Sequence, residues 1–222
     1  ENHLRMGAIG QAIDYVEKGT DLARSTGSRM LEGVGLGLLG EAWRQKKDLA
    51  KAREALGAAT ATFEEVECST EMTKVRVRMA ALLADEADLE RALELAERAY
   101  REATSAKTQE TIGLAALVLA RVEHVRGGLD RAMEMARHAA KVAEELRLPV
   151  FSWAVHHQLG RILSALGRFK EAKETYLRAV EEARVAWTRI PIDHKEEFLA
   201  DPRHIELSRD IRGLRDKLGA SR

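Results

Sequence analysis

Apolar and small residues recur along the chain at a spacing of 40 residues. One column of the repeat is alanine throughout: Ala12, Ala52, Ala92, Ala132 and Ala172. Three positions earlier the residue is always apolar: Ile9, Leu49, Leu89, Leu129 and Phe169. Seven positions later it is always small: Gly19, Ala59, Ala99, Ala139 and Ala179. Self-similarity at a fixed period predicts a stack of like structural units.

Each repeat is expected to contain two helices. The first helical face of the last repeat recurs at spacings of three and four residues: Val155, Leu159, Ile162, Leu163 and Leu166. Gly167 interrupts that pattern, and a second face begins at Phe169. Small residues stand where we expect the two helices of a pair to approach closely: Gly40, Ala80, Ala120 and Gly160. The pattern predicts an all-α fold of antiparallel helix pairs.

The repeat resembles the tetratricopeptide repeat. In that family Leu-Gly stands in the first helix, a large residue follows three positions later, and Ala, a large residue and Ala stand in the second helix. The last repeat matches with Leu159, Gly160, Leu163, Ala172, Tyr176 and Ala179, and the first full repeat with Leu39, Gly40, Trp43, Ala52, Leu56 and Ala59. The resemblance implies a right-handed α-solenoid. The third repeat departs from the pattern, because Glu123 stands where a large apolar residue is expected.

The period of 40 residues is longer than the family's usual length of about 34. In this the chain is similar to sensor regions of large bacterial signalling ATPases, transcription regulators and Ser/Thr kinases. We expect a solenoid over residues 1–188, made of a half unit and four full units: 1–27, about 28–67, 68–107, 108–148 and 149–188. Because the first residues supply only the second helix of a unit, we expect the chain to be a piece of a longer protein.

Residues 189–222 are expected to form C-terminal capping helices. Asp193 and Glu196 have the spacing of a capping box, and Pro202 is suited to a first helical position. A stripe of apolar residues then follows helical spacing: Leu207, Ile211, Leu214 and Leu218. A solenoid needs such a terminal element with a polar outer face.

Composition narrows the function classes. Lys plus Arg and Asp plus Glu both number 36, so the formal net charge is zero, which argues against nucleic acid and against a membrane surface as partners. The single cysteine, Cys68, cannot form an internal disulfide and fits a reducing compartment, so we expect a cytoplasmic protein. The chain has no apolar run approaching the roughly 18 residues of a membrane span.

The sequence contains no recognisable active site. His156 and His157 are neighbours and point about 100° apart on a helix, so they cannot chelate one ion as an i,i+4 pair could. Gly33, Gly35 and Gly37 lack the Gly-Lys-Ser/Thr ending of a phosphate loop. We therefore expect no enzyme, no catalytic residue, no metal and no cofactor.

Binding is the better hypothesis, since first helices line the concave groove of a tetratricopeptide solenoid. The resemblance places a set of polar residues there: Glu41, Arg44, Lys74, Arg78, Asp85, Arg121, His124, His157 and Arg161. Five of these are Lys or Arg and two are acidic, so the groove would favour an acidic peptide or protein partner. Solvated helix faces of no binding function are the simpler interpretation. A third hypothesis is a self-associating scaffold that uses apolar residues of the N-terminal helix near Ile9 and Ile13.

The aromatic residues are expected to serve packing. Trp43 and Tyr176 occupy core columns of the repeat pattern, and Trp187 is expected to dock the cap. For Trp153 packing is favoured over a place on the rim of the groove.

Overall fold

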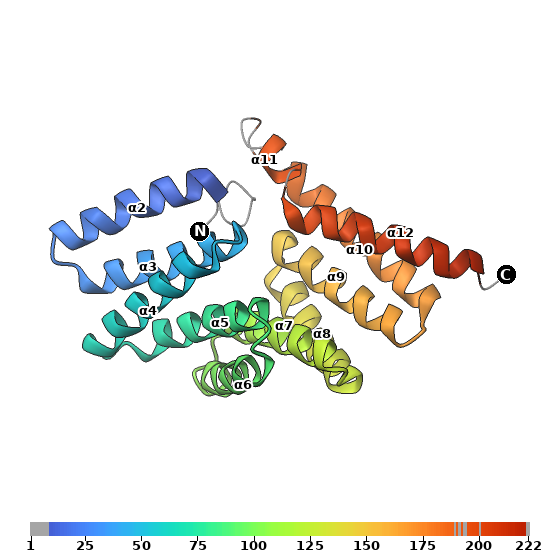
Figure 1. Ribbon diagram of the computed structural model, residues 1–222, viewed down its shortest axis with the longest axis horizontal. Coiled ribbons are helices and arrows are strands. Elements are labelled where there is room, and N and C mark those ends of the chain that lie inside the picture. Colours follow the sequence, from blue (N-terminus) through green and yellow to red (C-terminus); the bar gives the residue numbers. More distant parts are fainter. Residues whose placement is uncertain (1–8, 189, 191, 193–194, 200, 221–222) are drawn as a thin grey trace. The chain divides into compact units, whose positions relative to one another are not determined.

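The computed structural model describes residues 9–188, 190, 192, 195–199 and 201–220, without the side chains at 149, 150, 197, 199, 219 and 220. The regular elements of this part are helices, with no strand among them. They are α2 (Ile9–Ser25), α3 (Arg29–Gln45), α4 (Leu49–Glu65), α5 (Ser69–Asp85), α6 (Leu89–Ser105), α7 (Gln109–Arg126), α8 (Leu129–Leu146), α9 (Pro149–Ala165), α10 (Phe169–Thr188), α11 (Lys195–Leu199) and α12 (Pro202–Ala220) (Figure 1). The all-α helical-repeat fold of the solenoid class is confirmed; the division into four and a half units stays a prediction.

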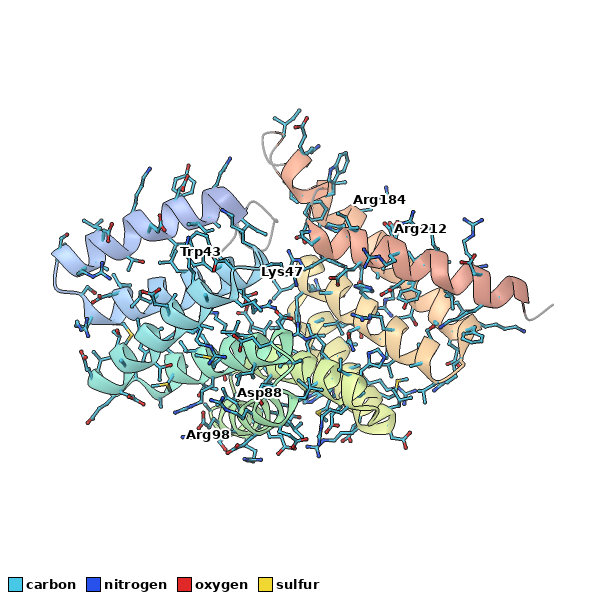
Figure 2. The ribbon with its side chains drawn as sticks, in the orientation of Figure 1. Trp43, Lys47, Asp88, Arg98, Arg184 and Arg212 are labelled. Atoms are coloured by element: carbon cyan, nitrogen blue, oxygen red, sulfur yellow. The ribbon has the colours of Figure 1, made fainter. Side chains whose placement is uncertain are left out.

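The helices start at a fixed interval that is half the sequence repeat. From Ile9 to Phe169, successive helices begin 20 residues apart. The turns keep the same interval through residues with positive φ: Gly27, Lys47, Glu67, Ala87, Lys107, Gly127, Arg147 and Gly167. At Lys47 (Figure 2), the next amide, that of Asp48, donates to the Trp43 carbonyl at 3.0 Å, and the Lys47 amide donates to the Arg44 carbonyl at 3.0 Å. This is the Schellman pairing that ends a helix with one left-handed residue.

The left-handed turns give a prediction of opposite sign at two equivalent positions. An L-residue with a side chain pays about 1–2 kcal/mol in this conformation, whereas glycine does not. Replacing Ala87 (φ +62°) with glycine is therefore expected to raise the free energy of unfolding by about 0.5–1 kcal/mol, after the entropy that glycine adds to the unfolded chain. Replacing Gly127 (φ +86°) with alanine should lower it by about 1 kcal/mol.

Urea unfolding followed by circular dichroism measures both changes. Among the described atoms, none lies within 4 Å of a Cβ built at Gly127, so the second substitution tests backbone conformation alone. Equal effects of the same sign at Ala87 and Gly127 would contradict this account of the turns.

Two compact units make up the chain, one from the start of α2 to Val118 and the other from Leu119 to the end of α12, so that α7 contributes to both. In the first unit α3 and α4 lie side by side as an antiparallel pair, and so do α5 and α6 (Figure 1). In the second unit α9 pairs with α10, and α12 packs against α10.

Small residues stand where the helices come closest, as the columns predict. A Cβ at Gly40 would lie 2.4 Å from Leu56 Cγ, and one at Gly160 would lie 2.5 Å from Tyr176 Cε1. Ala120 in the same column is fully buried. The glycines Gly33, Gly35 and Gly37 lie inside helix α3, where they admit Phe63, Thr20 and Arg78 respectively. These glycines therefore serve helix packing, and they do not form a phosphate-binding loop.

The cap packs through the predicted stripe. Leu207 and Leu214 are buried in one cluster with Trp153 and Tyr176, and Ile211 and Leu218 are partly buried against it. Pro202 begins α12, as expected. Trp153 is 1% exposed, so it packs in the core and does not lie on a rim.

Trp187 packs against the Phe198 cluster, as predicted for docking of the cap, with Lys195 Nζ 4.1 Å from its ring centre. Trp43 (Figure 2) packs against the cores on both sides of α3. The capping box predicted from Asp193 lies outside the described residues.

Helix α2 corrects one expectation. Ile13 is 5% exposed and packs with Leu39 and Ala42 of α3, and Ile9 packs against the same cluster. The apolar residues that we assigned to a self-association surface therefore face into the unit, because α2 turns its apolar stripe toward α3. The exposed large hydrophobic residues of α2 are Tyr15 and Leu22. In the part of the chain that the structure describes, no helix is long and apolar enough to cross a membrane.

Candidate functional site

In the first unit, the predicted binding residues are engaged with one another. Arg44 on α3 donates from Nη1 to Asp85 Oδ2 on α5 at 2.6 Å, and from Nη2 to Glu41 Oε1 at 2.8 Å. Gln45 Nε2 also donates to Glu41 Oε1, at 2.7 Å. The side chains of Arg44, Glu41 and Asp85 are 15%, 19% and 16% exposed. This half-buried network ties α3 to α5.

The network holds Glu41 strongly ionised. Burial alone would raise the pKa of Glu41, but the positive charge of Arg44 and the hydrogen bonds from Arg44 and Gln45 outweigh it and lower the pKa to about 2. Burial alone would lower the pKa of Arg44, and the charges of Glu41 and Asp85 more than compensate, so that it is raised. Arg78 lies close enough to contribute to the low pKa of Glu41.

Acidic neighbours therefore compensate the basic residues of the first unit. Lys74 Nζ lies 2.6 Å from Glu71 Oε1 on the same helix. Together with Glu41 and Asp85, this glutamate balances Arg44, Lys74 and Arg78 in number. The net positive groove that we expected from the sequence is thus absent from the described part of the first unit.

In the second unit, the predicted residues from α7 and α9 meet a carboxylate from the cap. Gln158 Nε2 lies 3.2 Å from His124 Nδ1, which joins α9 to α7. His157 Nε2 lies 2.8 Å from Asp210 Oδ2 on α12, and Arg161 Nε lies 3.5 Å from the same oxygen. Arg121 stands one turn before His124 on α7 and is half-buried. We call Arg121, His124, Gln158 and Arg161 the α7–α9 strip.

Electrostatics in this strip favour a neutral His124 and an ionised Asp210. Burial, reinforced by the charge of Arg161, lowers the pKa of His124, with a smaller opposing effect from Asp210. Burial alone would raise the pKa of Asp210, whereas the hydrogen bond from His157 and the charge of Arg161 lower it overall. Burial also raises the pKa of Tyr176, and the negative charge of Asp210 adds to that shift.

His157 is less accessible than a groove residue should be. It is 7% exposed, and its ring lies 6.5 Å from that of Trp153 and 6.0 Å from that of Tyr176. Our expectation placed it on the groove surface, but α12 covers it with Asp210. Arg161 remains open, with a side chain that is 39% exposed.

A second polar cluster lies on the other side of α9. His156 Nδ1 lies 2.7 Å from Glu182 Oε2 and 3.0 Å from the Ser152 carbonyl, and the Ser152 hydroxyl also bonds Glu182. Ser152 and His156 thus share one carboxylate, which differs from a nucleophile paired with a base. A surface pocket of about 240 Å³ lies beside them, lined by Ala143, Glu144, Arg147, Leu148, Ser152, Arg178, Glu182 and Val185. No group of three or more His, Cys, Asp and Glu among the described residues is placed to hold a metal ion.

Three partners in these clusters were missed from the sequence: Gln158, Glu182 and Asp210. Asp210 is 53 residues from His157, and no motif links the two. Its place three residues after Leu207 and four before Leu214 puts it on the edge of the apolar stripe, which is the only signal that it lies close to α9. Glu123, the departure from the repeat pattern, is 6% exposed, and its carboxylate lies 3.7 Å from Arg126 and 3.5 Å from Arg131.

Comparison with known families decides the type of domain. A family model described as "Tetratricopeptide repeat" matches residues 154–185, which include most of α9 and α10. The chain is a tetratricopeptide-type domain. The sequences of curated proteins give no match.

Solved structures share this tetratricopeptide-type fold at low sequence identity. The Rap protein complexed with Competence and Sporulation Factor is 15% identical with a TM-score of 0.75, over 100% of this chain and 74% of that one. BtubC (BKLC) from P. vanneervenii is 14% identical with a TM-score of 0.63, over 96% and 92%. Kinesin light chain-like repeats from Podosopora anserina give 17% and 0.56, over 83% and 91%.

Proposed function

We propose that this tetratricopeptide-type chain is a non-catalytic module that binds an acidic peptide or protein segment at the α7–α9 strip. The observation that carries the proposal is the open guanidinium of Arg161, which stands beside His124 and Asp210 at the edge of a polar row joining two successive first helices. Guanidinium and imidazole N–H groups bind carboxylates through charge-assisted hydrogen bonds.

Charge favours the second unit over the first as the place of binding. Arg121 and Arg161 face one aspartate, Asp210, within the described contacts of the strip, whereas Arg44, Lys74 and Arg78 of the first unit are balanced by three carboxylates. The Rap neighbour supports a peptide as the ligand class, since that protein is complexed with Competence and Sporulation Factor. A cytoplasmic location and a place in a larger signalling or regulatory protein belong to the same proposal.

Self-association through α2 is less favoured as an alternative. Ile13 is buried, and the exposed Tyr15 and Leu22 stand among the charged residues Asp14, Lys18 and Asp21. A dimer built on that surface would have to desolvate these charges, which is costly without partners for them.

Reversing the charge of the strip tests the proposal. The variant carrying Arg121→Glu and Arg161→Glu is compared with wild type in fluorescence anisotropy, using a labelled, end-blocked hexaglutamate peptide and hexaglutamine as the neutral reference. Wild type is expected to prefer hexaglutamate, and the variant should bind it about tenfold or more weakly, because charge-assisted hydrogen bonds are lost.

The matched control reverses two exposed arginines on second helices, Arg101→Glu and Arg184→Glu, and changes the net charge by the same amount. Arg184 is labelled in Figure 2. If both double variants lose the same affinity, the effect is one of overall charge and the strip is not the site. Circular dichroism of both variants checks that the helices are intact.

A further inference from the structure

The cap places a carboxylate of this chain on the residues that the proposed ligand would use. Asp210 Oδ2 lies 2.8 Å from His157 Nε2 and 3.5 Å from Arg161 Nε. A ligand carboxylate at the α7–α9 strip would seek the same guanidinium. Asp210 therefore stands in the chemical position of a ligand's acidic group.

Packing of the cap holds Asp210 in this position. Leu207 and Leu214, one turn to either side of Asp210 on α12, are 4% and 3% exposed. His204 adds to the anchoring, with its ring stacked 4.5 Å from Trp153 and 4.3 Å from Phe198. The carboxylate is thus delivered by buried apolar and aromatic contacts, and it stays near Arg161 without depending on its own ion pair.

The two partners of Asp210 differ in what a ligand can reach. His157 is buried, so a ligand could approach its Nε2 only if the Asp210 side chain moved aside. Arg161 is 39% exposed, and a guanidinium has several N–H donors, so it can meet a ligand while Asp210 is still in place. Asp210 itself is 27% exposed and has solvent beside it into which its side chain can turn.

We propose that Asp210 is an autoinhibitory carboxylate: the cap helix α12 presents it to Arg161 and His157, where it competes with the acidic group of a ligand and lowers the affinity of the strip. This inference rests on the proposed function. The competing hypothesis is that Asp210 orients Arg161 and His157 for the ligand, in which case its removal would weaken binding.

The test compares two isosteric substitutions on the same helix. Asp210→Asn removes the carboxylate charge and keeps an oxygen that can accept from His157. Asp216→Asn is the matched control, because Asp216 is an exposed residue of α12 and the change in net charge is the same. Both proteins titrate the labelled hexaglutamate and hexaglutamine peptides at about 150 mM salt, where long-range charge effects are screened.

We expect Asp210→Asn to bind hexaglutamate about threefold or more tightly than Asp216→Asn, with hexaglutamine unaffected. Adding Arg161→Gln to Asp210→Asn should remove that gain, since the freed guanidinium is its source. If thermal unfolding shows that Asp210→Asn has loosened α12, Asp210→Ser serves as the second variant, with the same expected gain.

The possible results separate this inference from the proposed function. If wild type binds hexaglutamate through Arg121 and Arg161 but Asp210→Asn binds no more tightly than Asp216→Asn, autoinhibition is overturned and the proposed function stands. Weaker binding by Asp210→Asn also overturns it, in favour of a positioning role. If neither wild type nor Asp210→Asn prefers hexaglutamate to hexaglutamine, both proposals are wrong.

Discussion

Replacing Gly160 with alanine is expected to lower the free energy of unfolding by about 1–3 kcal/mol, although alanine is the better helix former. The new Cβ would lie 2.5 Å from Cε1 and 2.6 Å from Cδ1 of Tyr176. That ring is 3% exposed and packed in the core of the second unit, so it cannot turn away without displacing its neighbours. Either the ring or the spacing of α9 and α10 must change, and both cost packing energy.

The same substitution at Gly57 supplies the control. Gly57 lies inside α4, and a Cβ there would meet none of the described atoms within 4 Å. Gly57→Ala should therefore raise the free energy of unfolding by about 0.5–1 kcal/mol. Urea titration followed by circular dichroism measures both variants. The close-packing account is wrong if Gly160→Ala proves as stabilising as Gly57→Ala.

Replacing Glu41 with glutamine is expected to cost about 2–3 kcal/mol of stability at pH 7. Folding lowers the pKa of Glu41 from its ordinary value of 4.5 to about 2. A carboxyl group whose pKa is lower in the folded state stabilises the fold above its unfolded pKa, and the stabilisation is lost as the pH falls through the folded value. The wild type should therefore lose this contribution between about pH 5 and pH 2, whereas Glu41→Gln should lack that part of the acid limb.

Glu54→Gln is the matched control, because Glu54 is an exposed residue of α4. The free energy of unfolding of all three proteins is measured from pH 7 down to pH 3. Acid limbs that run parallel in the wild type and in Glu41→Gln would show that Glu41 contributes no pH-dependent stability, and would remove the network with Arg44 and Asp85 as its source.

The sequence alone predicts the helices and their closest contacts, because packing repeats with the chemistry of side chains. The column of Gly40, Ala80, Ala120 and Gly160 predicts where two backbones approach, and the apolar stripe from Leu207 to Leu218 predicts how the cap packs. The 20-residue interval between helix starts is harder to see. The residues at its left-handed turns include Lys47, Glu67 and Ala87, so the backbone repeats there while the side chains do not.

The candidate site is predicted less well, because charge depends on partners from distant segments. The sequence places Arg44 and Asp85 in one groove but does not show that they bond each other at 2.6 Å and neutralise one another. It places His157 on the groove surface but gives no sign that Asp210 covers it. Net charge counted along helix faces is therefore a poor guide to the charge that a ligand meets.

The equal spacing of helix starts has a consequence for how such a chain can be lengthened or shortened. Each stretch of 20 residues carries one helix together with the turn that ends it. An in-frame duplication or deletion of two such stretches keeps first and second helices alternating, wherever in the repeats the break points fall. A change of one stretch exchanges their roles downstream, so that Gly160 and Tyr176 would lose the partners that their sizes fit. The unit of inheritance is therefore the pair, even though the unit of folding geometry is the single helix.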